Sequence, residues 1–166
     1  MRIAVYILWV LLLAVFQPTL ARDIAVWGIA PNLFLCFVVA VGLFRGRMEG
    51  AVCGMAFGLI YDLLIGRIMG IHALIYLYLG LGAGILGAQF FSGGRKLIVC
   101  LATAVSTLVA ALMYYLVQKA IGADVGFVIA IFRIGLLEAL YNGVVGFLLA
   151  YPICSSMKLM RMKILA

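Results

Sequence analysis

The chain has 166 residues, of which 69% are apolar and only 10% are charged, and its mean hydropathy is +1.33. This composition excludes a soluble globular domain, in which about half of the residues are apolar and about a quarter are charged. The net charge of +7 comes without the aromatic and basic motifs of nucleic-acid binding, so we expect no nucleic-acid partner. We therefore predict an all-α polytopic membrane protein.

Six apolar stretches predict six transmembrane helices in chain order. They cover about residues 3–20, 24–44, 50–65, 71–91, 97–117 and 127–151. We assign residues 1–154 to one transmembrane domain, because the loops are too short to hold a soluble one. A signal peptide ending at Thr19-Leu20-Ala21 is an alternative for the first stretch, but its apolar run is longer than such peptides need.

Basic residues in short loops predict the orientation, since such loops stay in the cytoplasm. With the N-terminus inside, the cytoplasmic side carries Arg2, Arg45, Arg47, Arg95, Lys96, Lys158, Arg161 and Lys163, and the outer side carries Arg22, Arg67 and Lys119. This asymmetry predicts an N-in, C-in topology. Residues 155–166 are predicted to form a basic amphipathic cytoplasmic tail, whose Lys158, Arg161 and Lys163 contact anionic lipid.

Small residues recur at four-residue spacing in and after the third predicted span. We call this set the glycine ridge: Gly50, Gly54, Gly58, Asp62, Gly66 and Gly70. Residues four apart share one face of a helix, and a glycine face lets another helix approach closely. The ridge therefore predicts a packing surface for a helix of this chain or of a partner.

Four polar side chains are predicted to share one layer in the outer half of the membrane. They are Gln17, Asn32, Asp62 and Arg133. At about 1.5 Å of rise per residue, Asp62 lies roughly 6 Å and Arg133 roughly 9 Å below the outer surface. Our hypothesis is that Asp62 pairs with Arg133, or that both join Asn32 and Gln17. Alternatively, Arg133 extends to the outer headgroups.

Two further polar residues lie deeper in the sixth span. Glu138 lies roughly 16 Å from the outer surface and shares a helix face with Asn142, so we predict a mid-membrane pair that hydrogen-bonds between helices. His72 and Gln118 fall at the outer rim, where we expect His72 to be an interfacial residue and not a catalytic one.

Cysteine spacing argues against metal or redox chemistry. Cys36, Cys53, Cys100 and Cys154 fall in four different spans, so we expect them to be packing residues and expect no metal and no cofactor.

Three short motifs resemble the MreD family, a small integral membrane family of the bacterial cell-elongation (Rod) machinery. They are Pro31-Asn32-Leu33, the block Gly58-Leu59-Ile60-Tyr61-Asp62-Leu63-Leu64-Ile65-Gly66 followed by Gly70, and Asn142 leading to Tyr151-Pro152. The similarity covers essentially the full length. Where the family commonly has an acidic residue after the proline, this chain has Asn32, which removes one charge.

The resemblance implies a non-enzymatic scaffold in the bacterial cytoplasmic (inner) membrane, with a fold similar to the substrate-binding subunits of energy-coupling-factor transporters. It implies binding to an MreC-like single-span protein, in a complex with an MreB-like filament, a RodZ-like protein and the glycosyltransferase and transpeptidase pair that builds lateral peptidoglycan. On this interpretation the glycine ridge or the outer polar layer receives the partner's transmembrane helix or juxtamembrane segment.

Two alternatives from other classes stay open. A vitamin-binding uptake subunit also needs an enclosed polar layer, but the first span lacks the Ala-x-x-x-Ala surface typical of such subunits. A proton-coupled transporter would use Asp62 and Glu138 as relays, but the sequence shows no internal repeat.

Overall fold

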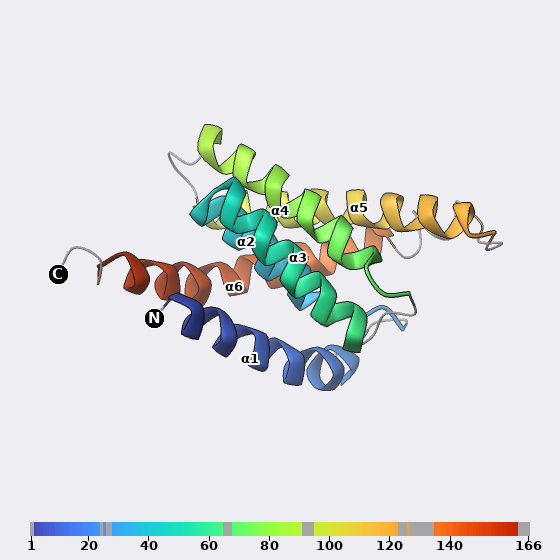
Figure 1. The fold of residues 1–166 in the computed structure, drawn as a ribbon, viewed down its shortest axis with the longest axis horizontal. Coiled ribbons are helices and arrows are strands. Elements are labelled where there is room, and N and C mark those ends of the chain that lie inside the picture. The colour runs from blue at the N-terminus through green and yellow to red at the C-terminus, as the bar shows by residue number, and fades with distance from the viewer. Residues whose placement is uncertain are drawn as a thin grey trace.

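The computed structural model describes residues 2–23, 25, 28–64, 68–90, 95–122, 126 and 135–162. Within these residues the chain forms six α-helices: α1 (Arg2–Asp23), α2 (Leu33–Arg45), α3 (Arg47–Leu64), α4 (Ile71–Phe90), α5 (Arg95–Ala120) and α6 (Leu136–Met162). Successive helices run antiparallel, and both chain termini lie at the same end of the bundle (Figure 1). We call this the terminal end, and the other, where α3 turns into α4, the loop end.

Three of the described helices contain apolar segments long enough to cross a membrane. These segments are Ile71–Gln89 in α4, Leu97–Ala120 in α5 and Leu136–Met157 in α6. The apolar segments of α1 and α2, Ile3–Thr19 and Leu33–Arg45, are shorter. The described structure is therefore all-helical, as predicted, and it contains helices suited to a bilayer.

The second predicted span, 24–44, is helical only from Leu33. Its preceding described residues are not helical, because Pro31 has no backbone N–H and disfavours helical geometry in the residue before it. Asn32 then caps the helix, since its Oδ1 accepts a hydrogen bond from the Leu35 N–H at 3.1 Å. With 13 residues, α2 is about 20 Å long, against about 30 Å for the hydrocarbon core of a bilayer.

The last helix also differs from the prediction of a span over 127–151. Residues 127–134 lie outside the described residues, and α6 continues past Tyr151 and through Pro152 to Met162. The first part of the predicted tail, 155–162, is thus a direct extension of α6.

The core of the bundle is α2. It contacts each of the other five helices, and all ten residues from Phe34 to Leu43 are buried. A helix that is apolar on every side is expected in such a central place. In Figure 1, α3 and α4 cover α2 from the front, while α6 crosses behind it.

Candidate functional site

The first three glycines of the ridge face α4. A Cβ atom added at Gly58 would lie 2.5 Å from the Cα of Ala73, and one at Gly54 would lie 2.5 Å from the carbonyl carbon of Tyr76. Those atoms belong to the backbone of α4, so no larger side chain fits without moving a helix. The structure therefore places the chain's own α4 against Gly50, Gly54 and Gly58.

The same contact extends to α2 through two glycines outside the ridge. A Cβ added at Gly50 would lie 2.7 Å from the Cα of Gly42, and one at Gly42 would lie 2.6 Å from the carbonyl oxygen of Gly80. The helices α2, α3 and α4 thus meet backbone to backbone around Gly42, Gly50 and Gly80. Close approach of this kind maximises dispersion contacts, which matter most where lipid removes the hydrophobic driving force between helices.

Asp62, the fourth position of the ridge, caps the N-terminus of α4. Its carboxylate is buried, with 2% of the residue exposed, and it accepts hydrogen bonds from the backbone N–H groups of Gly70 at 2.9 Å, His72 at 3.1 Å and Ala73 at 3.3 Å. His72 Nδ1 lies 2.6 Å from Asp62 Oδ1. Carboxylates are stabilised at a helix N-terminus by its free N–H groups and dipole. Asp62 therefore joins the end of α3 to the start of α4.

The remaining ridge positions belong to the connection between these two helices. Gly70 has a φ of +94°, which favours glycine, and its N–H reaches Asp62. Gly66 lies outside the described residues. So does Arg133, and its pairing with Asp62 stays a prediction.

Gln17 and Asn32 belong to a different group, at the start of α2. Gln17 Nε2 donates to the Pro31 carbonyl at 2.9 Å, and Gln17 Oε1 accepts from the Leu33 N–H at 2.8 Å. The Asn32 N–H donates to Asn142 Oδ1 at 2.7 Å. Amide side chains of α1 and α6 thus satisfy the backbone around Pro31–Leu33, which we call the α2 break.

The side chains of Asn32 and Asn142 extend this group to α4 and α5. Asn32 Nδ2 donates to the Tyr76 hydroxyl at 2.6 Å, and Asn142 Nδ2 donates to Thr107 Oγ1 at 3.0 Å. Asn142 Nδ2 also lies 3.5 Å from Glu138 Oε1, at the limit for a hydrogen bond. The predicted Glu138–Asn142 pair is thus one part of a larger network that connects five helices. Nothing in the sequence singled out Tyr76, but Thr103 and Thr107 share a helix face and offered a signal.

His72 lies among aromatic rings instead of at an open interface. Its ring centroid is 4.8 Å from Tyr61, 5.8 Å from Tyr76 and 5.2 Å from Tyr114, on which it stacks. Gln118 Nε2 donates to the Tyr114 hydroxyl at 2.8 Å. These contacts attach the α3–α4 turn to α5.

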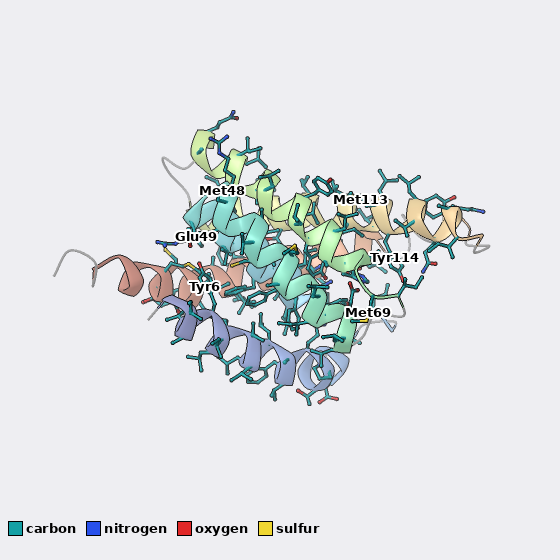
Figure 2. All side chains as sticks on the ribbon, viewed as in Figure 1. Tyr6, Met48, Glu49, Met69, Met113 and Tyr114 are labelled. Atoms are coloured by element: carbon teal, nitrogen blue, oxygen red, sulfur yellow. The ribbon has the colours of Figure 1, made fainter. Side chains whose placement is uncertain are left out.

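A third polar group, which the sequence analysis did not identify, joins α1 to α3 at the terminal end. The Tyr6 hydroxyl donates to Glu49 Oε2 at 2.8 Å, and Arg45 Nε and Nη2 each donate to the same carboxylate at 2.8 Å. The hydrogen bonds to Glu49 raise the pKa of the Arg45 guanidinium, because they stabilise its charged form. Figure 2 shows Tyr6 and Glu49 at this end, far from Met69 and Tyr114 at the loop end.

The side chains of the three basic tail residues lie outside the described part of the chain. Lys163 lies outside the described residues, as do the side chains of Lys158 and Arg161, although the helix backbone continues through both. Their contact with anionic lipid stays a prediction.

The architecture defines an α-helical membrane protein whose buried polar side chains hydrogen-bond to one another and to helix ends; in the described part of the chain, none of their buried N or O atoms lacks a partner. Residues 1–163 match the family model described as rod shape-determining protein MreD. The chain belongs to this MreD family, which confirms the resemblance found in its motifs. No curated protein and no solved structure matches the chain.

Proposed function

We propose that this chain is a non-enzymatic scaffold subunit of the cell-elongation machinery, which binds an MreC-like single-span protein and helps control peptidoglycan synthesis and rod cell shape. Membership of the MreD family over residues 1–163 carries the proposal. The proposed complex also includes an MreB-like filament, a RodZ-like protein and the glycosyltransferase and transpeptidase pair. Polar side chains that hold the helices together agree with a scaffold role. Asp62 bonds to the start of α4, and Asn142 bonds to the α2 break.

We further propose six membrane spans with both termini in the cytoplasm of a bacterium, in a fold similar to that of energy-coupling-factor substrate-binding subunits. The antiparallel order of the helices and the shared end of the two termini support this topology (Figure 1). Residues 28–32 complete the short second crossing. Non-helical backbone is tolerated at membrane depth where protein buries it, and both Pro31 and Asn32 are buried.

The partner's transmembrane helix meets an outward face of the bundle in this proposal, because α4 occupies the ridge at Gly50, Gly54 and Gly58. Each of three helices offers an exposed apolar position in its first half. These positions are Val52 on α3, Leu101 on α5 and Val144 on α6, with 61%, 58% and 62% of the residue exposed. A tryptophan at any of them adds bulk outside the bundle and leaves the core unchanged.

The test is affinity purification of the detergent-extracted protein with its neighbours. Recovery of a single-span protein with a large extracytoplasmic domain supports the scaffold, whereas copurification of a vitamin or an ATPase overturns it. Val52→Trp, Leu101→Trp and Val144→Trp serve as matched variants. Loss of the partner with one of them and retention with the other two identifies the docking face; retention with all three contradicts a transmembrane contact at these faces.

A further inference from the structure

The first helix is the most loosely held of the six. It packs along α2 and α3, with the sparsest contacts of any helix in the bundle. Of its described side chains only Leu13 and Gln17 are buried. It contains no glycine, and the bulky Trp9 stands between α1 and α2 with its ring centroid 5.1 Å from that of Phe37. α1 therefore lacks the backbone contacts that join α2, α3 and α4.

Polar contacts consequently carry a large share of the attachment of α1. In a bilayer, lipid tails are as apolar as leucine, so helices associate through close packing and hydrogen bonds. Among its described side chains, α1 makes polar contacts to other helices through Tyr6 and Gln17. Tyr6 bonds to Glu49 at the terminal end, and Gln17 makes two hydrogen bonds to the α2 break near the loop end.

A proline follows the second contact directly. Pro18 lies inside α1, where it cannot donate to the carbonyl of Ala14 four residues earlier, and prolines of this kind permit a helix to bend. The described groups around Gln17 are the backbone of Pro31 and Leu33. Both belong to the α2 break.

We propose that α1 is a movable arm, which separates from α2 and α3 when Gln17 releases the α2 break. The movement uncovers the stacked rings of Phe37 and Phe57, which lie 4.8 Å apart and are buried in the closed arrangement. Trp9 moves from Phe37 into lipid. The arm thus opens the side of the bundle between α2 and α3 while α3 to α6 keep their packing.

The fluorescence of Trp9 reports the movement of α1. The chain has two tryptophans, so a Trp27→Phe background leaves Trp9 as the single indole fluorophore. In vesicles of phosphatidylcholine with brominated acyl chains, an indole that faces lipid is quenched. We expect two lifetime populations, with the quenched one minor. Gln17→Leu, which removes both hydrogen bonds, should raise the open-to-closed ratio roughly five- to tenfold.

Thr19→Val is the matched control, because the described hydrogen bond of the Thr19 hydroxyl lies within α1, to the carbonyl of Val15. It should leave the ratio unchanged. Gln17→Glu keeps an acceptor for the Leu33 N–H, loses the donor to Pro31, and should give an intermediate ratio even if Gln17→Leu fails to fold. A single unchanged population in the Gln17 variants, or an equal effect of Thr19→Val, overturns the movable arm.

Discussion

Asp62 shows how hydrogen bonds stabilise a buried carboxylate inside a membrane protein. A charged group that faced lipid would cost on the order of 2.5 to 3.5 kcal/mol near the bilayer centre. Here three backbone N–H groups and the imidazole of His72 surround it. The free N–H groups of α4 need acceptors just as the carboxylate needs donors. Asp62, a charged residue in an apolar stretch, therefore supplies the acceptors that the N–H groups of α4 need.

Replacement of Asp62 is the most informative single change at this scale. Asp62→Ala leaves the Gly70, His72 and Ala73 N–H groups without their acceptor, so we expect a loss of about 1 to 3 kcal/mol of stability. Asp62→Asn keeps one acceptor oxygen and should lose less. Thermal unfolding in detergent measures both. Equal midpoints for Asp62→Ala and the wild type would show that the cap does not stabilise the fold.

Replacing Asn142 should cost more stability than replacing Glu138, although the sequence analysis predicted the two residues as one pair. Asn142→Leu removes the acceptor of the Asn32 N–H and the donor to Thr107, whereas Glu138→Gln keeps a side-chain oxygen that still accepts from Asn142 and Asn32. We expect Asn142→Leu to cost about 1 to 2 kcal/mol and Glu138→Gln less. Denaturant unfolding of the two variants compares them, and the reverse order would contradict the assigned network.

At the scale of helices, the α3–α4 pair depends on the absence of side chains. Gly54→Leu places atoms where the Tyr76 carbonyl lies, so α3 and α4 must separate, at a cost of about 1 to 3 kcal/mol or more. Gly82→Ala on α4 is the matched control, because nothing lies within 4 Å of its added Cβ. The folded yield and unfolding midpoint should fall only for Gly54→Leu. A similar fall for both would point to backbone flexibility and not to close packing.

The helical character of the chain was predictable because apolar composition and spacing act locally. Gly50, Gly54 and Gly58 indicated a close contact for the same reason, since one helix face is defined by the residues on it. Their partner was not predictable: α4 and a foreign helix would leave the same pattern in α3. The beginning of α2 was missed because apolar residues before Pro31 extended the hydrophobic stretch while the proline ended the helix.

The polar sites were only partly predictable for a different reason. Depth arithmetic placed Asp62, Gln17 and Asn32 in one layer, but depth does not give the angle around the bundle. In the described residues Asp62 bonds to the start of α4, whereas Gln17 and Asn32 bond around the α2 break. Tyr6 and Glu49 were missed because their contact joins residues 43 positions apart, which no local pattern indicates.

At the scale of the whole molecule, the topology has a direct test. Six spans with N-in, C-in orientation predict that a green fluorescent protein fused after Ala166 fluoresces and that alkaline phosphatase at the same place is inactive. Alkaline phosphatase inserted after Gly122, beyond the end of α5 at Ala120, should be active. Activity at the C-terminal fusion would exclude a C-terminus in the cytoplasm.

The predicted tail, residues 155–166, has a test of its own. Deleting residues 158–166 removes Lys158, Arg161 and Lys163 but keeps the buried Met157. If the tail contacts anionic lipid, partner recovery should not change, while each lost basic residue removes about 1 kcal/mol of attraction to an acidic membrane. Affinity purification and melting in vesicles with and without phosphatidylglycerol measure the two effects. Loss of a cytoplasmic partner would assign the tail to protein binding.

The hydrogen bonds of the α2 break can form only in a fixed order while the chain is being translated. The N–H of Asn32 and the amide of Asn142 that accepts its hydrogen bond are 110 residues apart. Gln17 has already been translated when the break emerges, so the Pro31 carbonyl finds its donor early and the Leu33 N–H finds its acceptor early. The Asn32 N–H gains its acceptor only after almost the entire chain has been translated. A nascent protein that stops before Asn142 keeps an unsatisfied backbone donor in the membrane, which is costly there, so truncated products should be less stable than the finished chain and more readily removed by membrane proteases.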